Sequence, residues 1–139
     1  MKPIDQLKAM IEAHGREKYP NIPEHGRPPA RVKVSDTNTL TSAVIQYIVL
    51  SGGYAVRINT QGQYDEKRKM WRPSTTRKGT ADIHACYKGR HISIEIKTGR
   101  DKQSEEQKQT EFDVLNAGGL YWIVSSFDQF YGLWNEAFS

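Results

Sequence analysis

The sequence predicts a mixed α/β domain in which one sheet is flanked by helices. Three observations favour this class. Apolar residues recur at helical spacing near both ends of the chain, they alternate with polar residues between 80 and 98, and glycine pairs separate several segments. A chain of 139 residues, 37% of them hydrophobic, is long enough to form one domain around its own core. The expected order of elements is α-α-β-β-β-α-β-α.

The first 35 residues are expected to form a helix and a proline-rich arm, followed by a domain over 36–139. One helical stripe over 4–15 consists of Ile4, Leu7, Met10 and Ile11. The arm is interrupted by Pro20, Pro23, Pro28 and Pro29. A second helix over 40–50 is predicted by Leu40, Val44, Ile45, Ile48 and Val49, and Gly52 and Gly53 end it.

The remaining segments alternate between strand and helix patterns. We expect a strand over 54–59, a basic loop or ribbon over 61–79, strands over 80–87 and 91–98, a helix over 104–117, a strand over 120–125 and a helix over 127–138. The last helix carries an aromatic stripe that is typical of a core or a dimer surface: Phe127, Phe130, Tyr131, Trp134 and Phe138.

The distribution of charge indicates a partner more clearly than its sum. The net charge is only +4, but residues 57–102 hold twelve of the 20 Lys and Arg and five of the 16 acidic residues, which gives +7 there. Such a basic segment indicates a polyanion-binding surface, or else a solvated charged loop. The candidate phosphate contacts are Arg57, Arg77, Lys78 and Arg100.

The sequence also predicts a location inside the cell. Cys86 is the single cysteine, so no intramolecular disulfide can form and a reducing compartment is expected. No apolar run reaches the roughly 18 residues of a membrane span, and residues 1–5 lack a signal-peptide core. We therefore expect a cytoplasmic protein without a membrane partner.

Residues 80–98 are expected to form a hairpin that brings polar side chains together. Lys88 and Gly89 suit a two-residue turn, because glycine tolerates the positive φ of tight hairpins. This turn places three pairs opposite each other: Asp82 with Glu95, His84 with Ser93, and Cys86 with His91. The other face would be apolar and consists of Ile83, Ala85, Ile92, Ile94 and Ile96.

Two carboxylates that face each other are unfavourable in an ordinary sheet, and a bound divalent cation would remove this penalty. Lys97 points to the same side as Glu95, where an ammonium can orient a water or stabilise charge on a phosphate. A surface ion pair between Lys97 and either acid is the alternative. A zinc site of His84, Cys86 and His91 is a further interpretation, although no fourth ligand is evident.

Four motifs in order resemble those of the VRR-NUC nucleases, which belong to the PD-(D/E)xK phosphodiesterase superfamily. They are Lys78-Gly79-Thr80-Ala81-Asp82, Ile94-Glu95-Ile96-Lys97-Thr98-Gly99, Ser104-Glu105-Glu106-Gln107 and Ala117-Gly118-Gly119, with a further likeness at Arg57-Ile58-Asn59. The resemblance covers about residues 37–127. It implies a restriction-endonuclease-like fold with an αβββαβ core.

The resemblance implies a Mg²⁺- or Mn²⁺-dependent DNA endonuclease. Asp82, Glu95 and the backbone carbonyl of Ile96 would be metal ligands, Lys97 the catalytic lysine, and Gln107 a further active-site residue. It also implies a homodimer that acts on branched DNA such as Holliday junctions, in repair, recombination or phage DNA processing. The family often has an acid near the start of the first core helix, where this chain has Thr37, with Asp36 as a possible substitute.

Some residues allow a second interpretation. Ser104 and Gln107 also fit a capping box, in which Gln107 bonds back to the start of its helix. Tyr64 and Trp71, which lie among basic residues, would either stack on bases or pack under the loop. Because the helix acid is missing, a non-catalytic nucleic-acid-binding module that retains the nuclease fold is the alternative function.

Overall fold

The computed structural model describes residues 1–58 and 63–139. Its elements are α1 (Pro3–Lys18), a 3-10 turn η1 (Glu24–Gly26), α2 (Thr37–Leu50), β1 (Tyr54–Arg57), β2 (Gln63–Asp65), β3 (Met70–Arg72), β4 (Ile83–Tyr87), β5 (Arg90–Ile96), α3 (Glu105–Asn116), β6 (Leu120–Val124) and α4 (Phe127–Phe138). This order confirms the predicted sequence of helices and main-sheet strands, and it adds β2 and β3 in the segment that was expected to be a basic loop or ribbon. The predicted end of the first strand, Asn59, lies outside the described residues.

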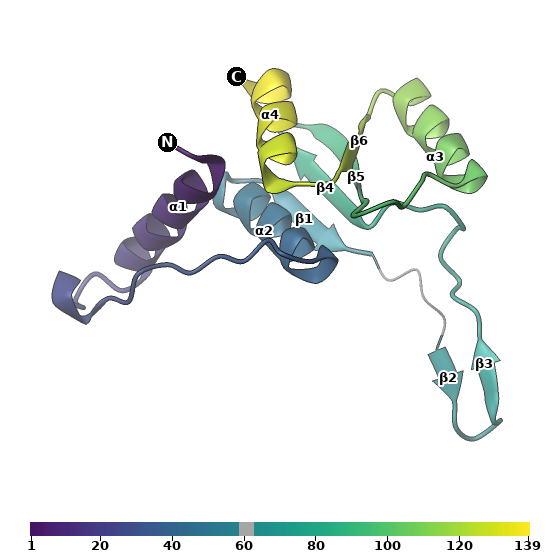
Figure 1. Cartoon of the computed structure of the whole chain (residues 1–139), viewed down its shortest axis with the longest axis horizontal. Helices are drawn as coiled ribbons and strands as arrows, with labels where there is room; N and C mark the ends of the chain where they lie inside the picture. Colours follow the sequence, from purple (N-terminus) through teal and green to yellow (C-terminus); the bar gives the residue numbers. More distant parts are fainter. Residues whose placement is uncertain (59–62) are drawn as a thin grey trace.

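One four-stranded mixed sheet forms the centre of the molecule, in the order β1-β4-β5-β6 (Figure 1). β1, β4 and β5 pair antiparallel, and β6 pairs parallel to β5. A parallel pair needs a crossover, which α3 supplies between β5 and β6. The mixed α/β class is therefore confirmed, and the restriction-endonuclease-like topology stays a prediction.

The hairpin of β4 and β5 has the predicted register. Ile83 pairs with Ile94, His84 with Ser93, and Cys86 with His91. The turn between the strands has positive φ at Lys88 (50°) and at Gly89 (78°), the pattern of a type I′ turn. The turn thus fixes which residues share each face of the sheet.

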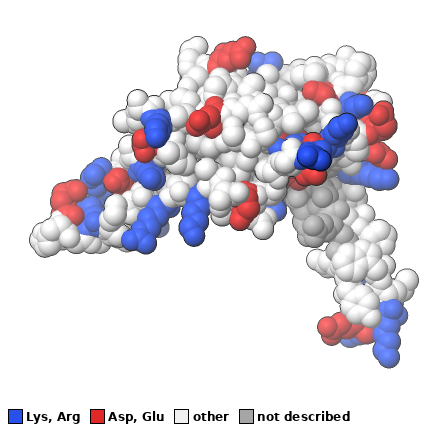
Figure 2. Space-filling model, viewed as in Figure 1, with Lys and Arg blue, Asp and Glu red and all other residues white. Residues whose placement is uncertain are grey.

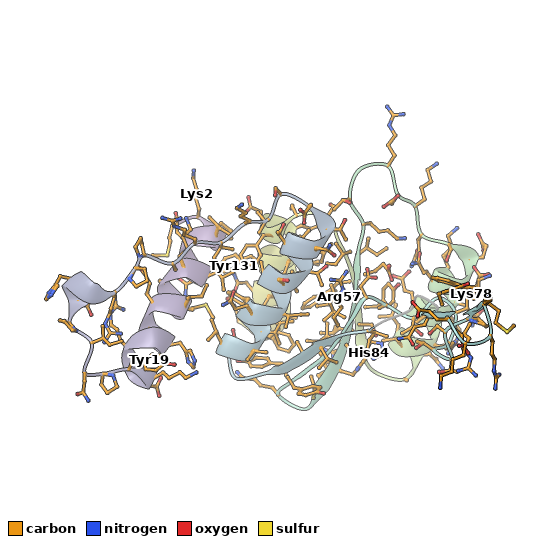
Figure 3. The ribbon with its side chains drawn as sticks, turned by 90° about the horizontal axis from the view of Figure 1, so that it is seen from below. Lys2, Tyr19, Arg57, Lys78, His84 and Tyr131 are labelled. Atoms are coloured by element: carbon orange, nitrogen blue, oxygen red, sulfur yellow. The ribbon has the colours of Figure 1, made fainter. Side chains whose placement is uncertain are left out.

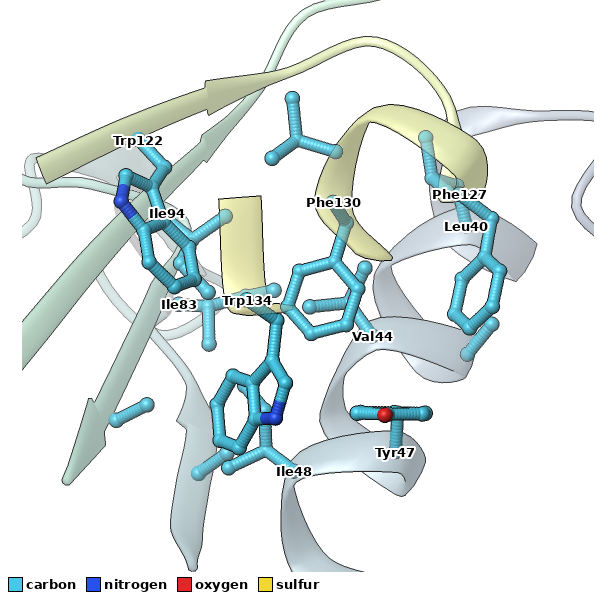
Figure 4. Close-up of a cluster of buried hydrophobic side chains, with 14 of the residues drawn as sticks. Leu40, Val44, Tyr47, Ile48, Ile83, Ile94, Trp122, Phe127, Phe130 and Trp134 are labelled. Carbon is cyan, nitrogen blue, oxygen red and sulfur yellow. The ribbon is translucent and has the colours of Figure 1, made fainter. Parts of the chain in front are cut away.

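The hydrophobic core lies between one face of the sheet and the helices α2 and α4 (Figure 4). The predicted apolar face of the hairpin is fully buried there, with Ile83, Ile92 and Ile94 at 0% exposure. The aromatic stripe of α4 fills the same space, since Phe130 and Trp134 pack edge-on against Tyr47 of α2. The stripe is therefore core rather than a dimer surface.

The N-terminal helix joins this core. Leu7 is fully buried, and α1 packs against both α2 and α4. Ile4, Met10 and Ile11 lie partly buried around it, which confirms the predicted apolar stripe. Helix α1 is thus packed on the body of the domain, and the mostly exposed arm that follows leads back from its far end to α2 (Figure 1). No helix of the described chain is long and apolar enough to cross a membrane.

Candidate active site

Three of the predicted site residues lie at one edge of the main sheet, where β1 and β5 end and β4 begins. Asp82 directly precedes β4, Glu95 is the penultimate residue of β5, and Lys97 directly follows that strand. The expectation that Asp82 and Lys97 lie within strands was therefore wrong. The ladder ends at the pair Ile83–Ile94, so Asp82 and Glu95 are not paired across it.

Asp82 leaves the ladder because its side chain replaces a backbone partner. The Ile96 N–H donates to Asp82 Oδ2 at 2.8 Å, and the backbone carbonyl of Asp82 accepts from the Ile58 N–H at 2.7 Å. These two bonds fix the carboxylate between β1 and β5. The N–H and C=O of one strand residue point to the same side, so the Ile96 carbonyl, a predicted ligand, also faces Asp82.

Glu95 is a buried carboxyl group next to a second one. It is 3% exposed, and its Oε2 has no hydrogen-bond partner in the described structure. Burial, reinforced by repulsion from the Asp82 carboxylate, raises the pKa of Glu95 to about 8, although Lys97 acts in the opposite direction. A buried carboxyl oxygen without a partner is costly, and either a proton shared with Asp82 or a bound cation would remove that cost.

Lys97 is the basic group nearest to this carboxyl. Its Nζ lies 3.9 Å from Glu95 Oε1, and the Lys97 side chain is 18% exposed. Its backbone N–H donates to the Val124 carbonyl at 2.9 Å, which fixes the residue beside the end of β6. The ion pair that the sequence offered as an alternative is present, but it is largely buried. The ammonium thus lies next to the Glu95 carboxyl group.

Asp82, Glu95 and Gln107 line one pocket with a volume of about 450 Å³. Arg77 and Lys78 line it from the segment that leads into β4. This segment passes close to α3 at Gly79, where φ is +88° and an added Cβ would lie 2.5 Å from the Glu106 carbonyl. A glycine is therefore needed there on two grounds, the positive φ and the close approach.

Gln107 acts as a helix cap in this structure. Its Oε1 accepts from the Ser104 N–H at 2.8 Å, and its own N–H donates to Ser104 Oγ at 3.2 Å, so both bonds of a capping box are made. The capping interpretation is confirmed. Because Gln107 also lines the pocket, its predicted active-site role stays open as a prediction.

The start of α2 lies beside the end of β5. Thr37 Oγ1 and Thr98 Oγ1 are 2.9 Å apart and share a hydrogen bond. Asp36 is the N-cap of α2 and accepts from the Thr39 N–H at 2.8 Å, and this bond lowers the pKa of its carboxyl. The Asp36 carboxylate is thus engaged in capping. Thr37, which stands where the VRR-NUC family often has an acid, contacts Thr98 instead.

The four predicted phosphate contacts come from three segments: Arg57 from β1, Arg77 and Lys78 from the segment before β4, and Arg100 from the loop after β5. Figure 3 labels Arg57 and Lys78. Arg57 donates to Asn38 Oδ1 at 2.8 Å, Arg77 pairs with Asp113, and Lys78 Nζ lies 3.1 Å from Glu106 Oε1. Arg100 is exposed in the loop after β5. Basic and acidic side chains are interspersed on the face seen in Figure 2. The acids on α3 thus offset part of the positive charge near the pocket.

The suggested zinc cluster does not assemble. His84 and His91 have ring centroids 5.4 Å apart, but His91 Nε2 shares a 2.7 Å hydrogen bond with Ser93 Oγ, and Cys86 is exposed. Burial lowers the pKa of both histidines. Among the described residues there is no group of three or more His, Cys, Asp or Glu side chains suited to a metal ion.

Sequence reasoning missed Tyr121 as a neighbour of this site. It pairs with Ser93, which places it on the face of the sheet that carries Glu95. Its hydroxyl is buried without a hydrogen-bond partner in the described structure, and burial raises its pKa to about 12. Alternation along β6 predicts that Tyr121 and the core residue Trp122 point to opposite faces of the sheet. The parallel pairing of β6 with β5, which the sequence does not show, is what places Tyr121 beside Ser93 and near Glu95.

Comparison of the sequence with models of known protein families and with curated proteins finds no match. The resemblance to the VRR-NUC nucleases therefore rests on the four motifs alone.

Proposed function

We propose that this protein is a divalent-metal-dependent phosphodiesterase that cleaves DNA. The observation that carries the proposal is the cluster of Asp82, Glu95 and Lys97 at the strand ends. The two acidic residues of this cluster line a pocket that is also lined by Arg77 and Lys78. Two adjacent carboxyl groups with a lysine are expensive to assemble in a half-buried site. A bound divalent cation would offset the repulsion between the two carboxyl groups and could bind phosphate oxygens.

The residues present fit Mg²⁺ or Mn²⁺. Glu95 Oε2 is buried and unpartnered, and Asp82 supplies a second carboxylate next to it. Mg²⁺ is commonly held by one or two carboxylates and keeps several waters, so a third side-chain ligand is not required. Asp82, Glu95 and the Ile96 carbonyl would hold the ion, which when bound polarises a phosphate oxygen and acidifies a water.

Lys97 lies where a cation could stabilise negative charge during phosphodiester cleavage. Its ammonium is anchored near Glu95 and is partly solvent-accessible, so it can hold an attacking water or stabilise charge that develops on the phosphate. The backbone of Lys97 is fixed by its hydrogen bond to the Val124 carbonyl, so its side chain starts from a defined position beside β6. Gln107, at the start of α3, lies where it can orient the same phosphate or water.

Arg77 and Lys78, which line the pocket, would hold the phosphate backbone together with Arg57 and Arg100. Contacts of this kind add affinity and salt dependence without reading sequence. A homodimer would present two such sites to two strands, which suits a branched substrate such as a Holliday junction. Repair, recombination or phage DNA processing in the cytoplasm of a bacterial host is the setting in which this activity would serve.

A non-catalytic nucleic-acid-binding module is the second candidate function. It is favoured by Thr37, which stands beside Thr98 where an additional acid would complete the ligand set. It is also favoured by the lack, within the described residues, of any three-residue metal-ligating group. In this case the fold and the basic rim would bind DNA without cutting it.

A panel of branched, linear duplex and single-stranded DNAs, incubated with Mg²⁺, Mn²⁺ or EDTA, separates the two candidates. We expect cleavage with either metal and none in EDTA. A protein that binds these DNAs with salt-dependent affinity but cleaves none of them with either metal would be the binding module. The panel also identifies the preferred DNA structure.

A further inference from the structure

The ribbon of β2 and β3 projects from the body of the molecule as a separate two-stranded sheet (Figure 1). Its strands contact each other, and neither has substantial contact with another element of the described chain. An isolated two-stranded hairpin is marginally stable in water. A ribbon that buries no core of its own is therefore best explained by something that it contacts outside the chain.

One face of the ribbon presents two aromatic rings to solvent. Tyr64 and Trp71 are directly opposite each other across the strands, so their side chains project from the same face. Tyr64 is 56% exposed and Trp71 is 62% exposed. Neither ring stacks on the other or on any described aromatic residue. Both rings are thus largely exposed, which favours stacking on bases over the packing role that the sequence offered as the alternative.

Positive charge surrounds these rings. The ribbon and its turn carry four cations against two acids, namely Lys67, Arg68, Lys69 and Arg72 against Asp65 and Glu66. Asp65 accepts from the Lys67 N–H at 3.0 Å and lies 3.9 Å from Arg68 and 3.7 Å from Arg72, so it shapes the turn and pairs with two guanidinium groups. This leaves Lys67 and Lys69 as the cations of the ribbon without an ion pair among the described residues. The charges at the tip are visible in Figure 2. Exposed aromatic rings among cations suit a nucleic-acid strand, because bases stack on rings while phosphates contact the cations.

The ribbon also starts and ends at the active-site edge. It leaves the sheet after β1 and returns to it at Asp82, and Ser74 and Thr76 on the returning segment line the same pocket as Asp82 and Glu95. A strand held in the pocket would therefore continue towards the ribbon. The same DNA strand could therefore contact the ribbon and reach the carboxyl groups in the pocket.

We propose that the β2–β3 ribbon binds unstacked nucleobases of a DNA strand, with Tyr64 and Trp71 as the stacking platform and Lys67 and Lys69 as phosphate contacts. This inference rests on the proposed function, since the bound strand is the substrate of the pocket. It explains selectivity for branched or single-stranded DNA, because base faces are available where stacking is interrupted and not within a continuous duplex.

Binding is measured in EDTA, where the proposed cleavage cannot occur, with an oligothymidylate of about 16 nucleotides, a branched DNA and a blunt duplex. The variants are Trp71→Ala, Tyr64→Ala and their combination. Tyr54→Ala is the matched control, because Tyr54 is 64% exposed but lies at the far end of β1. Thermal melts check that each variant is folded.

We expect the double variant to lose about 10-fold or more in affinity for the oligothymidylate and the branched DNA, with a smaller loss for the duplex and none for Tyr54→Ala. Trp122 and Trp134 are buried, so oligothymidylate should quench the fluorescence of Trp71 and this signal should disappear in Trp71→Phe. Unchanged affinity in the double variant, or an equal loss for all three DNAs, would overturn the proposal.

Together with a cleavage assay in Mn²⁺, the binding experiment distinguishes failure of the ribbon proposal from failure of the phosphodiesterase proposal. Aromatic-dependent binding in EDTA without any cleavage in Mn²⁺ supports the ribbon and contradicts the phosphodiesterase. Metal-dependent cleavage with unchanged binding by the ribbon variants does the reverse. Sedimentation of the wild type and of Trp71→Ala identifies a ribbon that joins two copies of the chain instead, since only then would the variant lose a dimer.

Discussion

Glu95 carries a buried carboxyl group that makes the stability of the metal-free protein depend on pH. Its pKa is raised to about 8 in the folded state, against about 4.5 in an exposed carboxyl. The folded state therefore favours the proton, and stability is fully present below about pH 4.5 and is lost as the pH rises to about 8. Bound metal would displace the proton and reverse this trend.

We expect the melting temperature of the metal-free protein to fall between pH 5 and pH 8.5, beyond the trend of the Glu95→Gln variant. The amide stays neutral throughout, so the difference between the two proteins reports on the ionisation of Glu95 together with its effect on Asp82 and Lys97. Thermal melts in EDTA at several pH values provide the measurement. Parallel curves for the wild type and the variant would show that Glu95 ionises normally.

The two roles of Gln107 can be separated by a conservative change in α3. Glutamate also completes a capping box, so Gln107→Glu should retain the stability of the helix, whereas Gln107→Ala should cost about 1 kcal/mol. If Gln107 orients a phosphate in the pocket, the new negative charge in Gln107→Glu should slow cleavage strongly. Urea melts and cleavage rates of the three proteins decide between them; full activity of Gln107→Glu would leave capping as its role.

The connection between the ribbon and β4 depends on Gly79. Gly79→Ala should destabilise the protein by at least about 2 kcal/mol and distort the pocket, because a Cβ would meet the Glu106 backbone and the φ is positive. Gly89→Ala is the control, since its φ is +78° but the space around it is open, and it should cost only about 1 kcal/mol. Chemical denaturation compares the two variants. Equal losses would show that the approach to α3 does not matter.

At the scale of elements, alternation and turn chemistry predicted the hairpin because both act locally. Lys88 and Gly89 determined the register, and the register determined the apolar face. The end of the ladder was not predictable, since it depends on a side-chain bond from the Ile96 N–H to Asp82 and on the passage of Gly79 beneath α3. The lack of substantial contact between the ribbon and the other described elements was also not predictable, because it depends on the tertiary arrangement and not on the local sequence.

At the scale of the whole molecule, the N-terminal helix is part of the hydrophobic core and is more than an extension of the domain. Leu7→Ala should cost about 3 kcal/mol, because Leu7 is fully buried between α1 and the other helices. Ala9→Gly, at an exposed position of the same helix, should cost about 1 kcal/mol through helix propensity alone. Equilibrium unfolding tests both. A loss in Leu7→Ala no larger than in the control would mean that α1 is only loosely attached.

The central claim is that Asp82, Glu95 and Lys97 form a metal-dependent phosphodiesterase site. Its most direct test is the single-turnover rate of DNA cleavage in saturating Mn²⁺ by the wild type, Glu95→Gln, Lys97→Ala and Glu105→Gln, in which a solvent-exposed glutamate of α3 is changed as the matched control. We predict rates at least about 100-fold lower for Glu95→Gln and Lys97→Ala, with DNA binding retained and the control unaffected. Cleavage at the wild-type rate by either site variant would contradict the assignment.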